Sequence, residues 1–211
     1  DARLGRWLSL DPRIDFQRSP YSSMGDNPIF NNDILGDEFK TKKDKRLANK
    51  VQKNADSQIS YYEKQISSNN LSNEEVAELR EMIIELENAK LEIDDLSNSE
   101  TVYTFNKRGV NVGGNLELAD NGIVTINYDN FNTMVHELKH AHQFEKGDVN
   151  YNIDLSPGST YDINDEVEAY KRGFAFGDKG HFNGYNKITK EAVRNLKHPE
   201  NGKKAYFTLP N

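Results

Sequence analysis

Two histidines and a glutamate lie within one short stretch of the chain, His136-Glu137-Leu138-Lys139-His140. Residues four apart on an α-helix project from nearly the same face, so one helix would aim both imidazoles at a single metal ion. The HExxH spacing is typical of zinc-dependent peptide hydrolysis, in which the glutamate takes a proton from water and returns it to the leaving amine. The motif therefore predicts zinc ligands at His136 and His140 and a general base at Glu137.

A catalytic zinc ion usually has three protein ligands and a fourth position left for water. The chain has no cysteine, so the third ligand must be a histidine or a carboxylate. Residues 163–176 carry apolar side chains at helical spacing and predict a second helix, which bears Glu166 and Glu168. These two side chains point about 200° apart around a helix, so only one can face the metal. We predict Glu166 as the third ligand, with Glu168 as the alternative.

Three further side chains near these segments could take part in a site. His181 lies in a glycine-rich loop, residues 178–185, that could close over the cleft. Either His181 or Tyr170 would donate a hydrogen bond to the oxyanion of a tetrahedral intermediate. His142 lies about 200° around the helix from His140, so we expect it to pack or hydrogen-bond away from the metal.

Local patterns predict the elements that position these residues. Residues 122–128 alternate β-branched and polar side chains as a half-buried strand does, and Asn130 or Thr133 would cap the HExxH helix that follows. The segment Lys146-Gly147-Asp148 would end that helix. Further short strands are expected at 101–105 and 110–112, a helix at 189–196 and a final strand at 205–209.

A long antiparallel helical hairpin is expected before these elements, over residues 38–97. Residues 67–70 are polar and form the predicted turn, and Ser72 with Glu75 matches a capping box for the second helix. The hairpin could cover the cleft, contact a partner or brace the core, and we favour bracing because apolar helix stripes usually pack inward. Together these elements predict an α+β fold.

An HExxH helix completed by a glutamate on a following helix resembles the gluzincin-like metallopeptidases. The sequence HELKHAHQFEKG followed by DEVEAYKRG is similar, over about residues 101–185, to metallopeptidase domains at the C-termini of bacterial polymorphic toxins. The resemblance implies a zincin-like catalytic domain at 98–211, a Zn²⁺ cofactor, a protein or peptide substrate and a cognate immunity protein. It also implies secretion or delivery into a target cell as part of a larger effector.

The first residues resemble a second family. DARLGRWLSLDP, followed by SPY and NPI, is similar to the RHS repeat-associated core, which closes a β-cocoon of the parent chain just before a toxin domain. This resemblance covers residues 1–37. Members often self-cleave with paired aspartates, and Asp11 and Asp33 occupy the matching places. The second block lacks the expected proline, so an autoprotease and a short leader both remain open.

Composition excludes other classes of function. The chain has 211 residues, a formal net charge of -7 and no broad cationic face, which argues against nucleic-acid binding. It has no apolar run of about 18 residues, so no membrane span is expected. Its 35% hydrophobic content predicts that part of the chain is elongated or exposed.

The leading hypothesis is a zinc endopeptidase that serves as the toxin domain of a secreted antibacterial RHS effector. One alternative is a catalytically inactive zincin-shaped module that docks a target or partner protein. The other is a processing unit in which only Asp11 and Asp33 carry out chemistry.

Overall fold

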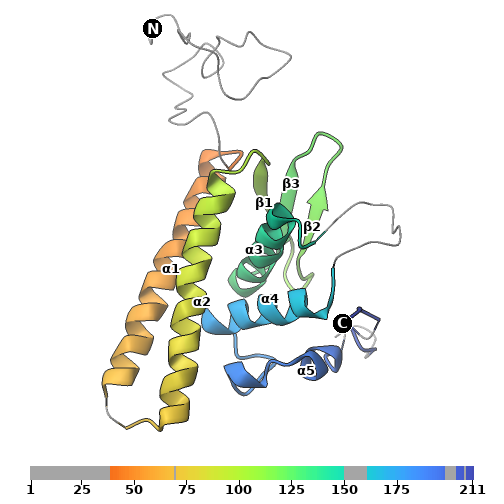
Figure 1. Ribbon diagram of the computed structural model, residues 1–211. Helices are drawn as coiled ribbons and strands as arrows, with labels where there is room; N and C mark the ends of the chain where they lie inside the picture. Colours follow the sequence, from red (N-terminus) through yellow and green to blue (C-terminus); the bar gives the residue numbers. More distant parts are fainter. Residues whose placement is uncertain (1–38, 69, 150–160, 198–202, 207) are drawn as a thin grey trace, which may run out of the picture.

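The computed structural model describes residues 39–68, 70–149, 161–197, 203–206 and 208–211. Within these residues the chain is α+β, with five α-helices, one short 3-10 helix and one three-stranded sheet (Figure 1). The RHS-like segment with Asp11 and Asp33 lies outside the described residues, so the structure does not test the predictions made for it.

The predicted helical hairpin is present. Helix α1 spans Lys42–Ser67 and α2 spans Asn73–Ser97, and the two run antiparallel along one side of the molecule (Figure 1). Ser72 and Glu75 form the expected capping box, in which each side chain accepts from the other residue's backbone N–H. The apolar stripes of the two helices face each other and are buried, at Ala48, Val51, Ala55 and Tyr62 on α1 and Met82, Leu86, Ala89 and Ile93 on α2.

The sheet has the strand order β1-β3-β2, with β1 at Tyr103–Lys107, β2 at Asn115–Leu118 and β3 at Val124–Tyr128. Strand β3 pairs in parallel with β1 and antiparallel with β2. The prediction of a strand at 110–112 is wrong. Val110 is 84% exposed and Asn111 has a φ of 62°, so this stretch turns through solvent and pairing begins only at Asn115. Residues with high strand propensity do not form a strand unless a neighbouring strand can pair with them.

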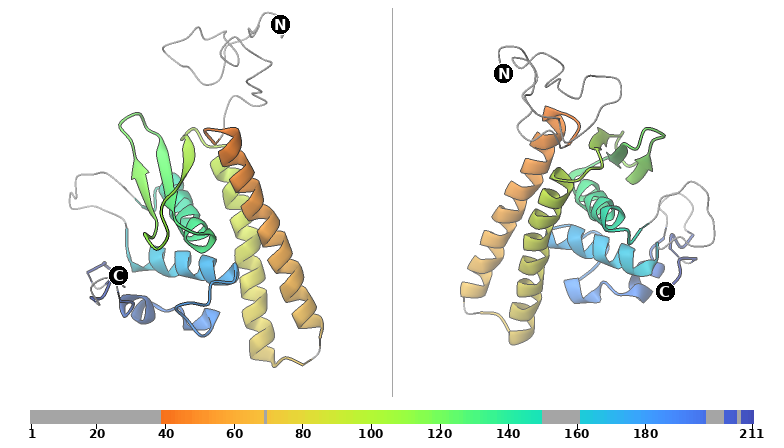
Figure 2. Two further views of the ribbon diagram at one scale, coloured as in Figure 1. Left: turned by 180° about the vertical axis from the view of Figure 1, so that it is seen from behind. Right: turned by 45° about the horizontal axis from the view of Figure 1, so that its top comes forward.

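Helix α3, Phe131–Lys146, carries the HExxH motif and contacts β3, α2 and α4 (Figures 1 and 2). Of the two predicted caps, Asn130 is the residue used, because its side chain accepts from the backbone N–H of Thr133. Gly147 ends the helix with a φ of 80°, a left-handed conformation that glycine adopts at little cost. Helix α3 therefore begins directly where β3 ends, as the sequence predicts.

Helix α4, Ile163–Ala175, crosses α3 and bears both candidate third ligands (Figure 2). It is followed by the 3-10 helix η2, Tyr185–Lys187, and by the short helix α5, Lys190–Arg194. The prediction of a final strand at 205–209 is wrong. The described residues there form a turn after a single bridge between Lys197 and Lys204, and none of the described strands lies alongside to extend the ladder.

Ion pairs between largely buried side chains link the hairpin to helices α3 and α4. The buried guanidinium of Arg172 on α4 donates to Glu85 at 2.6 Å and to Glu92 at 2.7 Å, both on α2. Glu92 also accepts from Lys139 of α3 at 2.9 Å. Burial favours the neutral form of Glu92, but the charges of Arg172 and Lys139 outweigh it and lower the pKa of this carboxyl. The hairpin thus braces the core, which is the role that the sequence favours.

Replacing Arg172 with methionine should destabilise the protein, because Glu85 would keep its charge without its buried partner and Glu92 would keep only Lys139. We expect a loss of about 3–5 kcal/mol in the free energy of unfolding, measured by urea denaturation. The control is Lys90→Met, which removes the cation of the exposed Lys90–Asp56 pair between α1 and α2 and should cost about 0–1 kcal/mol. Equal losses for the two variants would contradict a bracing role for Arg172.

Candidate metal centre

His136, His140 and Glu166 meet where α3 crosses α4, and they form a group that could hold a metal ion. The two histidine Nε2 atoms lie 3.2 Å apart. The carboxylate oxygens of Glu166 lie 3.5 Å from Nε2 of His136 and 3.6 Å from Nε2 of His140. Ligand atoms about 2.0–2.2 Å from a tetrahedral zinc ion lie about 3.3–3.6 Å from one another. The first distance from Glu166 is to its Oε2 atom and the second to its Oε1 atom, so the two imidazoles and the carboxylate have spacings close to those around a tetrahedral zinc ion.

The carboxylate of Glu166 provides a second test of this fit. The residue is only 3% exposed, and its Oε2 atom is buried without a hydrogen-bond donor among the described residues. Such orphaned acceptors are rare in folded proteins because burying them is costly. A cation between the three side chains would remove that cost, so the donor set suits a metal such as zinc.

The three side chains also shift one another's pKa values. Burial favours the neutral form of Glu166, but the neighbouring imidazoles of His136 and His140 hold the pKa of its carboxyl below the ordinary value. Burial lowers the pKa of His140, but Glu166 outweighs that effect and raises it to about 9. Glu166 is therefore already ionised as a metal ligand must be, and a metal ion would displace a proton from His140.

The structure separates the two candidate third ligands. Glu168 turns away from the histidines, where its carboxylate accepts from Gln143 at 3.1 Å and lies 3.3 Å from Lys139. Glu166 instead faces the histidines, and its Oε1 atom accepts a hydrogen bond from the hydroxyl of Tyr161. Tyr161, which the sequence analysis missed, also lies edge-on to the His140 ring, with 5.8 Å between the ring centroids.

Gln143 orients one of the two imidazoles, and sequence reasoning did not identify it. Its buried amide oxygen lies 2.7 Å from Nδ1 of His140, while its amide nitrogen donates to the carbonyl of Asp165 at 3.3 Å. Because the amide oxygen can only accept, Nδ1 must carry the proton, and Nε2 is left free to bind a metal. Its HExxHxxQ position, three residues after His140, was the only signal in the sequence.

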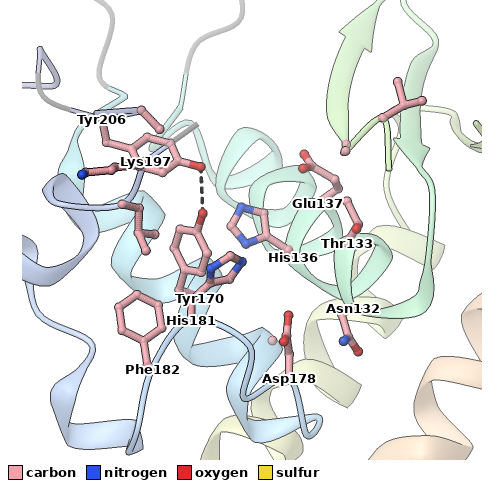
Figure 3. A pocket seen from close by; sticks show the side chains of 16 residues that line it. Asn132, Thr133, His136, Glu137, Tyr170, Asp178, His181, Phe182, Lys197 and Tyr206 are labelled. Carbon is pink, nitrogen blue, oxygen red and sulfur yellow. Dashed lines mark hydrogen bonds between the residues drawn. The ribbon is translucent and has the colours of Figure 1, made fainter. Parts of the chain in front are cut away.

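Glu137 lies beside the candidate ligands and lines a pocket of about 420 Å³, together with His136 and Tyr170 (Figure 3). The side chain is largely buried at 6% exposure. Burial raises the pKa of Glu137, although the neighbouring charges of His136 and His140 oppose the shift. A carboxyl with a raised pKa accepts and returns a proton closer to neutral pH, as a general base and acid must.

The loop before β2 fits closely against Glu137. A Cβ atom at Gly114 would lie 2.6 Å from Cγ of Glu137 and 2.7 Å from its Oε1 atom, so only glycine leaves room for this carboxylate. Asp129 fastens the loop, since its carboxylate accepts from the N–H of Gly113 at 3.1 Å and from the hydroxyl of Thr133 at 2.6 Å. The general-base candidate is thus held between its own helix and a glycine of the loop before β2.

Of the remaining predicted residues, Tyr170 and His181 line the pocket, whereas His142 lies where α3 meets α2. The centroid of the Tyr170 ring lies 4.8 Å from that of the His136 ring and 6.0 Å from that of the His181 ring. His142 lies outside the group of ligands, with Nε2 at 3.2 Å from Asp95 of α2. Tyr206 also lines the pocket, and nothing in the sequence around it indicated that position.

Comparisons with models of protein families, with curated proteins and with solved structures gave no match to this chain. Within the described ranges, no helix is both long enough and apolar enough to cross a membrane. The side chains of the site are therefore the basis for assigning a function.

Replacing Gln143 with leucine should weaken zinc binding by about 10–100-fold, the usual effect of losing the partner of a metal-binding histidine. Gln143→Glu keeps an oxygen acceptor for Nδ1 of His140 and should retain more of the affinity. Competition with a zinc chelator measures both.

The control for Gln143 is Gln65→Leu, which removes an amide of the same size that hydrogen-bonds Tyr61 on α1. Its zinc affinity should equal that of the parent protein. A Gln143→Leu protein that binds zinc as tightly as this control would show that Gln143 does not orient His140.

Proposed function

We propose that this protein is a zinc-dependent endopeptidase, with His136, His140 and Glu166 as metal ligands and Glu137 as general base. The main support is the spacing of the His136 and His140 imidazoles and the Glu166 carboxylate, which is close to that around a tetrahedral zinc ion, together with the buried, unpaired Oε2 atom of Glu166. Glu137 beside this group in a pocket distinguishes it from a purely structural metal site.

When bound, zinc would act as a Lewis acid that polarises the scissile carbonyl and lowers the pKa of water in the site to about 7. Glu137 takes the proton of the attacking water and then delivers it to the leaving amine. Glu137 packs closely against Gly114, which limits the orientations of its carboxylate. The carboxylate is therefore already positioned for proton transfer before the substrate binds.

The opposite wall supplies hydrogen-bond donors for the substrate carbonyl. Tyr170 and His181 both line the pocket, and either can donate to the negative oxygen that develops as the carbonyl becomes tetrahedral. Strand β2 lies at the edge of the described sheet, and the Gly113-Gly114 segment that leads into it lines the same pocket. An extended peptide added to this edge would pass the site, which is consistent with cleavage within a chain.

The RHS-like residues 1–37 and the toxin-like motif suggest where the enzyme acts. We extend the proposal to a toxin domain that is secreted or delivered into competing bacteria as part of a larger effector. Such a domain needs a cognate immunity protein in the producing cell, and the pocket is the surface that this partner would block.

Glu137→Gln removes the proton acceptor and preserves the shape of the side chain. Cleavage of a denatured protein mixture should fall by about 10²–10⁴-fold, while zinc content by metal analysis stays at one ion per chain. The matched control is Glu87→Gln on the exposed face of α2, which should cleave as the parent does. Equal cleavage by the Glu137→Gln protein would refute the mechanism, and toxicity that survives this change would favour a docking module.

Gly114→Ala should displace Glu137 without disturbing the metal ligands. We expect kcat/KM to fall by about 10²-fold, as small misplacements of catalytic groups often cause, with unchanged zinc affinity. Gly109→Ala in the same loop is the control, since its Cβ would meet only Val112 at an ordinary 3.7 Å. Similar activities of the two variants would show that the contact with Gly114 does not position Glu137.

A further inference from the structure

Two tyrosine hydroxyls meet at the wall of the pocket opposite Glu137 (Figure 3). The hydroxyl oxygens of Tyr170 and Tyr206 lie 3.0 Å apart, and either can be the donor. Tyr170 comes from α4, four residues after Glu166, and its ring touches that of His136 edge-on. Tyr206 comes from residues 203–206, after α5. The pair therefore joins the helix of the third ligand to a segment distant in the sequence.

Backbone contacts on both sides hold Tyr206 in place. Immediately before it, the N–H of Ala205 donates to the carbonyl of Leu196 at 2.9 Å. Beyond it, the carbonyl of Pro210 accepts from the N–H of Ile163, the first residue of α4, at 3.1 Å. Tyr206 is thus fixed relative to α4 by the chain around it as well as by its own side chain.

The direction of this hydrogen bond decides what Tyr170 can do. A phenol has one proton to donate, so if Tyr170 donates to Tyr206 it has none left for a substrate. If Tyr206 donates instead, the proton of Tyr170 is free to point into the pocket. A donated hydrogen bond also polarises the acceptor hydroxyl and makes it a stronger donor. A negative oxygen in the pocket would favour this second direction.

Tyr170 has no competing hydroxyl partner in the part of the chain that the structure describes. Around it lie the rings of His136, His181, Phe182 and Tyr206, at centroid distances of 4.8, 6.0, 5.5 and 6.0 Å. These rings limit how far the Tyr170 side chain can swing. Burial raises the pKa of both phenols, so both retain their protons at neutral pH.

We propose that Tyr206 is a positioning residue that donates its hydroxyl proton to Tyr170, so that Tyr170 donates to the oxyanion formed on the scissile carbonyl. This inference rests on the proposed peptidase function and assigns the oxyanion donor to Tyr170 rather than to His181. No bond of the tyrosines is broken in this role. The only change is a stronger hydrogen bond as negative charge develops.

A double-mutant cycle tests the coupling of the two hydroxyls in the zinc-loaded protein. Tyr170→Phe should lower kcat by about 10²–10³-fold, as loss of an oxyanion donor does. Tyr206→Phe should lower kcat by about 3–10-fold with little change in KM, since it removes one supporting hydrogen bond. In the Tyr170→Phe background, the Tyr206→Phe change should have no further effect. Equal losses in both backgrounds would overturn the proposal.

A binding measurement gives a readout that does not depend on cleavage. Methylphosphonate is a small tetrahedral anion, and its affinity for the zinc-loaded protein can be measured by calorimetry. Tyr206→Phe should weaken binding by about 3–10-fold in the parent and leave it unchanged in the Tyr170→Phe protein. Tyr61→Phe, which alters a hydroxyl that is bonded to Gln65 on α1, is the control and should bind as the parent does.

The two readouts separate the possible failures. A zinc-loaded parent protein that cleaves no peptide would refute the peptidase function, while the methylphosphonate affinities would still decide whether Tyr206 acts through Tyr170. Unchanged affinity in Tyr206→Phe would overturn the proposal whatever the activity. Melting temperatures of all variants, measured with zinc present, show whether any loss comes from unfolding.

Discussion

The negative charge of Glu166 is the constraint on which the rest of this structure depends. Its carboxylate is buried between His136 and His140, and one of its oxygens has no donor among the described residues. A buried anion is tolerated only when positive charge or hydrogen bonds compensate for lost hydration. The crossing of α3 and α4 creates this environment, and the bonds of Arg172 and Lys139 to the hairpin hold the two helices at that crossing. A metal ion would complete the balance of charge.

Each side chain proposed to act on the substrate is positioned by a residue that would take no part in the reaction itself. Glu137 lies against Gly114, which the bond from Gly113 to Asp129 fixes in turn. Tyr170 lies on the other side of the pocket and is hydrogen-bonded to Tyr206. This arrangement has a physical reason. Proton transfer and oxyanion binding depend on sub-ångström placement, and a side chain with a single anchor on its own helix retains too much rotational freedom.

Local patterns predicted most of the elements but not where strands pair. The hairpin within 38–97 follows from helical periodicity and a capping box, both of which act between residues close in sequence. The segments 110–112 and 205–209 were expected as strands from their β-branched and aromatic residues, yet neither forms one. A strand exists only if a neighbour supplies hydrogen bonds, and the presence of that neighbour depends on the whole fold.

The sequence by itself determined that His136 and His140 share one helix face, because the pitch of a helix places residues four apart on the same side. It also predicted that a third ligand would be a carboxylate on the following helix, Glu166 or Glu168. Only the tertiary structure decided which of the two carboxylates faces the histidines, since the rotation of α4 about its own axis is set by packing against α2 and α3. The same holds for the contact of Tyr206 with Tyr170, which spans 36 residues. Short-range geometry is encoded locally, whereas contacts between distant residues exist only once the chain has packed.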